Sequence, residues 1–178
     1  ERDSFNNSRM QVELIPPDGG SLDVTLRGSS SMNVFFEDIV EGSAFDDDGD
    51  GRDEVSAEIT QMNLTGVCIL GPITMSLNPE EVSFGLIEET ANNTPSLLDV
   101  PPFATTGTAE SFFDVYFQIE IGGQILHTKI PKHIAGTISN KPPLLGNIYT
   151  DCIKVELLNQ AGMGTGYYLG CIEYEPSA

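Results

Sequence analysis

Short stretches in which apolar and polar residues alternate recur along the chain, and this two-residue period constrains the fold more than any other feature. Successive side chains of a β-strand point to opposite faces of a sheet, so alternation indicates strands with one buried face. The stretches are also rich in β-branched and aromatic residues, which favour strands. The predicted strands are Met10 to Ile15, Leu22 to Leu26, Met32 to Val40, Val55 to Leu64, Ile73 to Leu77, Phe112 to Ile121, Gln124 to Thr128, Ile134 to Ser139, Ile153 to Leu158 and Tyr167 to Glu173.

Glycine and proline separate the predicted strands. Clusters such as Pro16 to Gly20 and Pro142-Pro143 break any helical continuation. Gly122-Gly123 lies between two alternating stretches and predicts a two-residue hairpin, because both central residues of such turns often need a positive φ. Only Pro79 to Ala91 has helical character, and a loop is the alternative there.

The chain has 178 residues, with 11 prolines and 18 glycines, which suits one all-β domain. We expect an antiparallel β-sandwich of the jelly-roll or immunoglobulin-like type, with a barrel as the alternative. Residues 16–178 form this domain in the prediction. Residues 1–15 form an N-terminal arm with one strand, which either lies in its own sheet or completes the sheet of a neighbouring subunit.

The charge balance restricts the partners. The chain carries 27 acidic and 8 basic residues, for a net charge of -19. Such a surface repels nucleic acid and anionic lipid and favours cations, although acidity also simply keeps a secreted protein soluble. No apolar stretch reaches the roughly 20 residues that a membrane span needs. The start at Glu1, without Met or a signal-peptide pattern, suggests a processed chain.

One acidic loop has the composition of a metal site. Asp46-Asp47-Asp48-Gly49-Asp50-Gly51 places carboxylates at alternate positions before a glycine that permits a sharp turn. Calcium binds about six to eight oxygen ligands, and such a loop directs three carboxylates at one centre. The alternative is a solvated acidic turn without a metal. The predicted calcium ligands are Asp46, Asp48 and Asp50, the carbonyl oxygen of Arg52, and Glu54 or Asp53.

The loop is not an EF-hand. The twelfth position counted from Asp46 is Ala57 rather than Glu, and strands are predicted on both sides. It resembles instead the calcium loops of thrombospondin type 3 repeats and of dockerins, in which the same D-x-D-x-D-G core is found in secreted proteins.

The three cysteines do not have the spacing of a zinc site. Cys152 and Cys171 lie near the ends of the last two apolar segments, and they predict a disulfide if those segments pair as neighbouring strands. Cys68 is then left over, and we expect it to be a small buried side chain rather than a reactive thiol.

Three N-x-[ST] sequences are candidate glycosylation sites at Asn6, Asn63 and Asn92. Asn6 and Asn92 lie in stretches predicted to be flexible, whereas Asn63 lies in a predicted strand and must face outward to accept a glycan.

Catalytic motifs are not evident. The obvious bases are His127 and His133, which we expect to be surface residues beside Lys129 and Lys132. There is no G-x-S-x-G, H-E-x-x-H or phosphate-binding glycine loop. The sequence therefore predicts a protein that is not an enzyme, and the remaining catalytic alternative is a pair of carboxylates for glycoside hydrolysis.

The chain contains several long, specific strings, which are Asp48 to Gly51, Glu58 to Gly66, Gly85 to Glu89, Asn92 to Pro95, Pro101 to Phe103, Gly107 to Ala109, Ser111 to Val115 and His127 to Pro143. Together these strings resemble an uncharacterised family of predicted secreted bacterial proteins. The resemblance covers roughly half of the chain and implies secretion and an acidic metal-type loop at Asp46, Asp48 and Asp50. It implies no assigned activity.

Taken together, these features predict a structural subunit of an extracellular fibre, filament or surface layer. Calcium would stabilise the subunit, which would self-associate into a homopolymer, with strand addition by residues 1–15 as one route. The alternative is a secreted carbohydrate- or surface-binding module with glycans as partners. Its candidate aromatic residues are Phe112, Phe113, Tyr116 and Phe117, of which alternation places at least half in the core.

Overall fold

The computed structural model describes residues 1–178 and consists of strands, turns and loops. It contains no helix that is long and apolar enough to cross a membrane. The strands are β1 (Arg2–Ile15), β2 (Leu22–Phe35), β3 (Glu54–Cys68), β4 (Gly71–Leu77), β5 (Ser83–Glu89), β6 (Ala109–Val115), β7 (Phe117–Ile121), β8 (Gln124–His127), β9 (Lys132–Ile138), β10 (Tyr149–Asp151), β11 (Val155–Leu158) and β12 (Gly164–Glu175).

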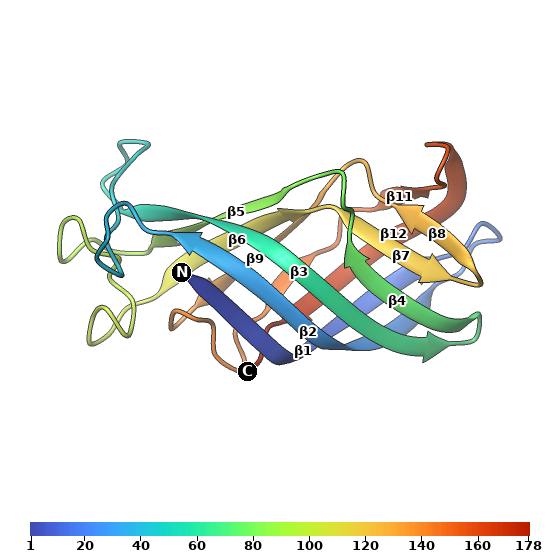
Figure 1. Cartoon of the computed structure of the whole chain (residues 1–178), viewed down its shortest axis with the longest axis horizontal. Helices are drawn as coiled ribbons and strands as arrows, with labels where there is room; N and C mark the ends of the chain where they lie inside the picture. Colours follow the sequence, from blue (N-terminus) through green and yellow to red (C-terminus); the bar gives the residue numbers. More distant parts are fainter.

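The four long strands form a wall in the order β12-β1-β2-β3 that runs the length of the molecule (Figure 1). The short strands form two rows, and each row connects β3 back to β12. Strands β4, β7, β8 and β11 close one half of the molecule, and β5, β6, β9 and β10 close the other. Strand β3 belongs to both halves, since Glu54 to Ile59 pair with β5 and Asn63 to Cys68 pair with β4. The sheet therefore closes on itself around one continuous interior.

The predicted all-β, antiparallel class is confirmed. The two separate sheets of a sandwich are not formed, because all twelve strands belong to one hydrogen-bonded sheet, and a closed sheet is closer to the barrel alternative. Residues 2–15 are not a projecting arm: they form β1, which pairs with β2 along one edge and with β12 along the other. Exchange of this strand between subunits stays a prediction.

Strand positions follow the alternation well, and the differences have tertiary causes. Gly122 and Gly123 form the β7–β8 hairpin turn with φ of 57° and 76°, as predicted. The segment with helical character contains strand β5, because pairing with both β3 and β6 outweighs its local preference. The predicted strand Phe112 to Ile121 breaks at Tyr116, where the chain passes from one half of the closed sheet to the other.

One cluster of 33 buried apolar residues fills the interior. Tyr149 and Tyr174 lie within it, and each hydroxyl group has a partner. Tyr149 donates to Ser111 Oγ at 3.0 Å, and the Tyr174 hydroxyl lies 2.5 Å from Ser30 Oγ. Buried hydroxyl groups require such partners, so these serines fix the two rings in the core.

A disulfide joins Cys152 to Cys171, as predicted, and the last two predicted segments pair as β11 with β12. Cys152 itself lies between β10 and β11. Beneath the disulfide lies the fully buried Lys132, whose ammonium group donates to Gly170 O at 2.7 Å and to Ile153 O, and pairs with Asp151 at 2.7 Å. One cation thus holds both backbone segments that flank the disulfide. Cys68 is free and half-buried rather than fully buried.

Replacement of Phe113 tests the single core. Phe113 is fully buried against Tyr149, with ring centroids 5.6 Å apart, so Phe113→Ala should lower the free energy of unfolding by about 3–5 kcal/mol. Phe84→Ala is the control, since Phe84 is 58 % exposed on the neighbouring strand, and should cost less than about 1 kcal/mol. Denaturant unfolding measures both, and equal losses would contradict this packing.

Candidate metal site

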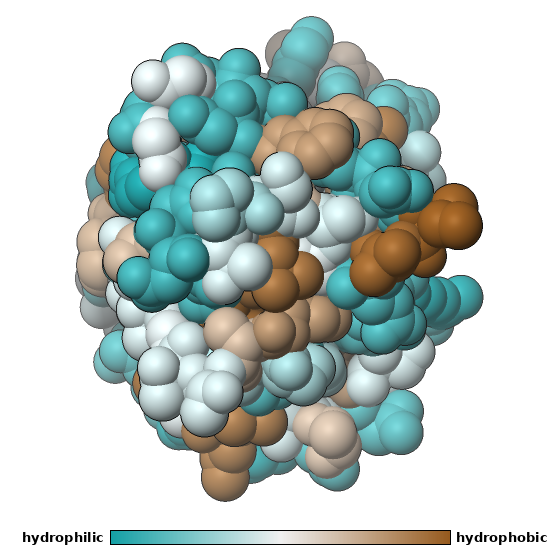
Figure 2. All heavy atoms as spheres, turned by 90° about the vertical axis from the view of Figure 1, so that its left-hand side faces the viewer, coloured by the Kyte–Doolittle hydropathy of each residue, from teal (hydrophilic) through white to brown (hydrophobic).

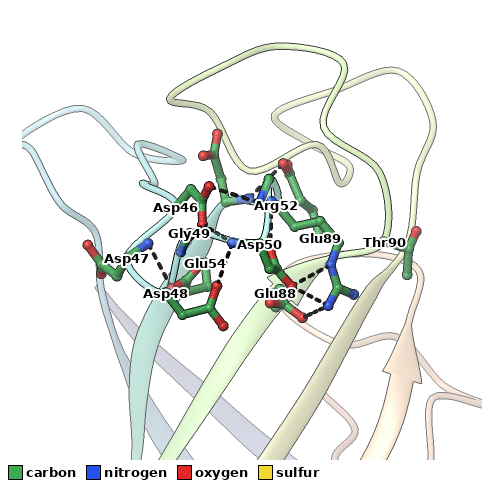
Figure 3. Close-up of polar contacts among 12 residues, drawn as sticks. Asp46, Asp47, Asp48, Gly49, Asp50, Arg52, Glu54, Glu88, Glu89 and Thr90 are labelled. Atoms are coloured by element: carbon green, nitrogen blue, oxygen red, sulfur yellow. Dashed lines mark hydrogen bonds and ion pairs between the residues drawn. The ribbon is translucent and has the colours of Figure 1, made fainter.

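The acidic loop connects β2 to β3 at one end of the molecule and folds around Asp46 (Figure 3). Asp46 Oδ1 accepts hydrogen bonds from the backbone N–H groups of Gly49 at 2.7 Å and Asp50 at 3.0 Å, and Oδ2 accepts from Gly51 at 2.9 Å. Gly49 and Gly51 have φ of 81° and 91°, a conformation that favours glycine. These glycines allow the tight turn that brings the carboxylates together.

Asp46, Asp48 and Glu54 form a first carboxylate group, in which one oxygen of each lies within 4.8 Å of the others. Glu54 begins β3 and is only 4 % exposed. Its Oε1 accepts a hydrogen bond from Asp47 N at 2.9 Å, whereas its Oε2 is buried without a partner. Burial, and then repulsion from Asp48, raises the pKa of Glu54. A buried carboxylate oxygen without a donor is costly, and a bound cation would relieve that cost.

Asp48, Asp50 and Glu88 form a second carboxylate group, and here the protein supplies its own cation. The Arg52 guanidinium group contacts Asp50 Oδ2 at 2.6 and 3.0 Å and Glu88 Oε1 at 2.9 Å. The same residues are drawn in Figure 3, where dashed lines join the Arg52 guanidinium group to both carboxylates. The Arg52 side chain thus makes three charge-assisted contacts, and the predicted role of its carbonyl oxygen as a ligand stays a prediction.

Glu88 is not among the predicted ligands, because it lies on β5, far from the acidic loop in the sequence. The antiparallel pairing of β3 with β5 sets Glu88 directly opposite Glu54, and so adds a carboxylate to the loop. Burial raises the pKa of Glu88, while Arg52 acts in the opposite direction. Only knowledge of the strand register could have identified this residue.

Asp53, one of the predicted options, belongs to neither carboxylate group. It is buried, and its Oδ2 accepts a hydrogen bond from Ser96 N at 2.7 Å, on the side of the loop formed by residues 90–108. Glu89, also buried, accepts from Asp53 N at 2.9 Å and from Asp99 N at 2.8 Å. These carboxylates tie the base of the acidic loop to the neighbouring loop through backbone N–H groups.

The candidate glycosylation sites differ in exposure. Asn6 is exposed but lies in β1 rather than in a flexible arm, and Asn63 on β3 faces outward as a glycan would require. Asn92 is half-buried, with a buried Oδ1 that has no hydrogen-bond partner.

The aromatic residues considered for ligand binding lie mostly inside. Phe113 and Phe117 are fully buried, whereas Phe112 and Tyr116 are half-buried. Phe112 stacks on His133 with ring centroids 4.7 Å apart. His133 is exposed, as expected, and its Nδ1 lies 2.7 Å from Asp114 Oδ1. Lys132, the preceding residue, is buried and does not share this surface.

No family model and no curated protein matches the sequence. The resemblance to a secreted bacterial family therefore stays a prediction. Among solved structures, the chain is similar to DynF from the dynemicin biosynthesis pathway of Micromonospora chersina, with a TM-score of 0.70 and 18 % sequence identity. The similarity covers 100 % of this chain and 81 % of that one. At this identity the likeness establishes a shared fold.

This likeness corrects the prediction that the chain is not an enzyme. That prediction depended on the lack of familiar catalytic motifs, and the fold is shared with a protein of a biosynthesis pathway. Fold and function are separable, so missing motifs in a chain with this fold do not assign it to a non-enzymatic class.

The raised glutamate pKa values predict an unusual pH dependence for the metal-free protein. Burial raises the pKa values of Glu54, Glu88 and Glu89. Their contribution to stability is present below the ordinary glutamate pKa and is lost as the pH rises through the raised values. Thermal unfolding with a chelator should therefore give a lower melting temperature at pH 7 than at pH 5.

Glu54→Gln should reduce this pH dependence, because the amide does not ionise. Glu173→Gln, at an exposed position of β12, is the control and should leave it unchanged. A metal-free protein whose melting temperature increases from pH 5 to pH 7 would contradict the prediction.

Proposed function

We propose that the chain is a secreted structural module that binds calcium in its acidic loop and self-associates through the same end of the molecule. The observation that carries the proposal is the unpartnered, buried Oε2 of Glu54 beside the carboxylates of Asp46 and Asp48. Three carboxylates with one buried oxygen left without a donor favour a bound cation over a solvated turn.

The donor atoms favour calcium among the common cations. The first carboxylate group offers only oxygen atoms and no histidine or cysteine, which suits a hard cation rather than zinc or copper. Calcium tolerates irregular geometry, so carboxylates contributed by a loop and a strand suit it better than magnesium, which demands a near-ideal octahedron. The net charge of -19 adds a general attraction for cations.

Two features support an extracellular location. The disulfide between Cys152 and Cys171 is of the kind that persists in oxidising compartments. A calcium loop that lies mostly on the surface also suits the high calcium concentration outside cells, where weak sites are filled.

Exposed apolar side chains at this end of the molecule support self-association. Figure 2 shows this face, on which apolar groups lie among hydrophilic ones. Ile39 is 99 % exposed and Val40 is 61 % exposed, and both lie in the loop that follows β2. Phe45 is also exposed and directly precedes Asp46. Leu144 and Leu145 are exposed in the loop between β9 and β10. Exposed apolar groups of this kind favour contact with another protein surface, here a second copy of the chain.

Calcium binding should be measurable on the purified protein. Isothermal titration should show one site, and calcium should raise the melting temperature, because a ligand that binds only the folded state stabilises it. Asp46→Asn should weaken binding strongly, since Asp46 lies at the centre of the loop. Asp18→Asn, at an exposed turn at residues 16–20, should bind as the natural chain does. No heat and no shift in melting temperature at millimolar calcium would refute the site.

Self-association should depend on both calcium and the apolar loop. Sedimentation velocity should show assemblies larger than 19.2 kDa with calcium and smaller species after chelation. Ile39→Ser should shift the distribution toward monomer. Ile69→Ser is the matched control, because Ile69 is 86 % exposed but lies in the β3–β4 turn. A monomer in every condition would refute assembly while leaving the calcium site intact.

A further inference from the structure

Lys141 is a fully buried lysine whose ammonium group faces two carboxylates, that of Asp3 on β1 and that of Glu1 just before β1. It lies in the loop between β9 and β10, where its backbone N–H donates to Pro101 O at 2.8 Å. Its Nζ lies 3.1 Å from Asp3 Oδ1 and 3.0 Å from Asp3 Oδ2, and it also contacts Glu1 Oε1. The near-equal distances show that Nζ faces both oxygen atoms of the Asp3 carboxyl group, so the two groups that would react are already in contact.

The surroundings of this cluster are apolar on the side away from the carboxylates. Nζ lies 5.3 Å from the centroid of the Phe36 ring, which itself packs edge-on against Phe103 with centroids 5.4 Å apart. The side chains of Lys141 and Asp3 are buried, whereas that of Glu1 is partly exposed. Glu1 therefore connects the buried pair to solvent.

Burial destabilises the charged form of each residue of the pair relative to its neutral form. It raises the pKa of Asp3 to about 6 and lowers the pKa of Lys141 to about 8. A neutral amine is a nucleophile and a neutral carboxyl group is an electrophile, so these shifts favour the reactive forms.

We propose that Asp3 and Lys141 join in an intramolecular amide (isopeptide) bond, with Glu1 as the group that transfers the proton. The Glu1 carboxylate takes a proton from the Lys141 ammonium group and delivers it to the Asp3 carboxylate. The free electron pair of Nζ then attacks Asp3 Cγ, and the N–C bond forms.

The C–O bond of the tetrahedral intermediate breaks as Glu1 transfers the second Nζ proton to the departing hydroxyl group. The ammonium and the carboxylate thus become one amide and one molecule of water. No oxidant or reductant is required. The product links β1 covalently to the loop that follows β9, and it does not depend on the metal site or on self-association.

Lys132 is also fully buried in the same molecule, and its contacts differ from those of Lys141. Its ammonium group is 2.7 Å from Asp151 but is also held by the carbonyl oxygens of Ile153 and Gly170. Asp151 is its one carboxylate partner, so Lys132 lacks the second carboxylate that Glu1 supplies to Lys141. The geometry therefore assigns one cross-link to the chain, at Lys141.

The mass of the intact, disulfide-reduced chain tests the proposal. The natural chain should weigh about 18 Da less than its sequence, the mass of one water, and a protease digest should yield a branched peptide that joins Asp3 to Lys141. Lys141→Arg keeps the charge and removes the nucleophile, so its mass should equal that of its sequence. Lys132→Arg is the control and should keep the deficit.

Two further variants identify the chemistry. Asp3→Asn should lose ammonia rather than water, a deficit of about 17 Da. Glu1→Gln keeps Lys141 and Asp3 but should form the bond more slowly, as seen in the fraction cross-linked after refolding.

Three outcomes would overturn the proposal. One is a full-mass natural chain. The second is a deficit that persists in Lys141→Arg, as cyclisation of Glu1 at a chain terminus would produce. The third is a digest without the branched peptide, and this readout on the natural chain holds even where a variant does not fold.

Discussion

The pairing of β1 with β12 is the interaction on which the rest of the structure depends, because it closes the sheet. Without it the wall β12-β1-β2-β3 would have two free edges and the interior would open along its full length. Closure pairs the second edge of β1 with β12 from Arg9 to Ile15, which removes much of the exposed edge through which sheets aggregate. It also encloses one apolar core, so a change in the packing of one half of the molecule should also affect the stability of the other half.

Closure of the sheet also determines which carboxylates meet at the acidic loop. Strand β3 pairs with β5 only in this half, and that register places Glu88 opposite Glu54. The loop that precedes β3 therefore meets carboxylates from two strands, and Arg52 balances one of the two groups. The other group retains a buried oxygen without a donor. Local sequence supplies the aspartates, but the tertiary pairing creates the imbalance that favours a cation.

The features predicted correctly from the sequence are those that depend on residues close together in the chain. Alternation located most strands, the Gly122-Gly123 hairpin formed as expected, and Cys152 and Cys171 are joined. The prediction of two packed sheets was incorrect because alternation indicates which side of a strand is buried, not which strands are neighbours. For the same reason Glu88 and the turning of Asp53 toward Ser96 could not be inferred. The strand β5 was missed because its pairing with β3 and β6, rather than its own residues, stabilises it.

The position of β1 between β2 and β12 restricts when a neighbour could take its place. Eleven residue pairs join β1 to β2, and six more join it to β12, so a mature subunit would have to break both ladders before giving up the strand. A chain that has not yet closed faces no such barrier. Any polymerisation by strand donation would therefore compete with folding itself, and its timing would be set during biogenesis, before the subunit is complete.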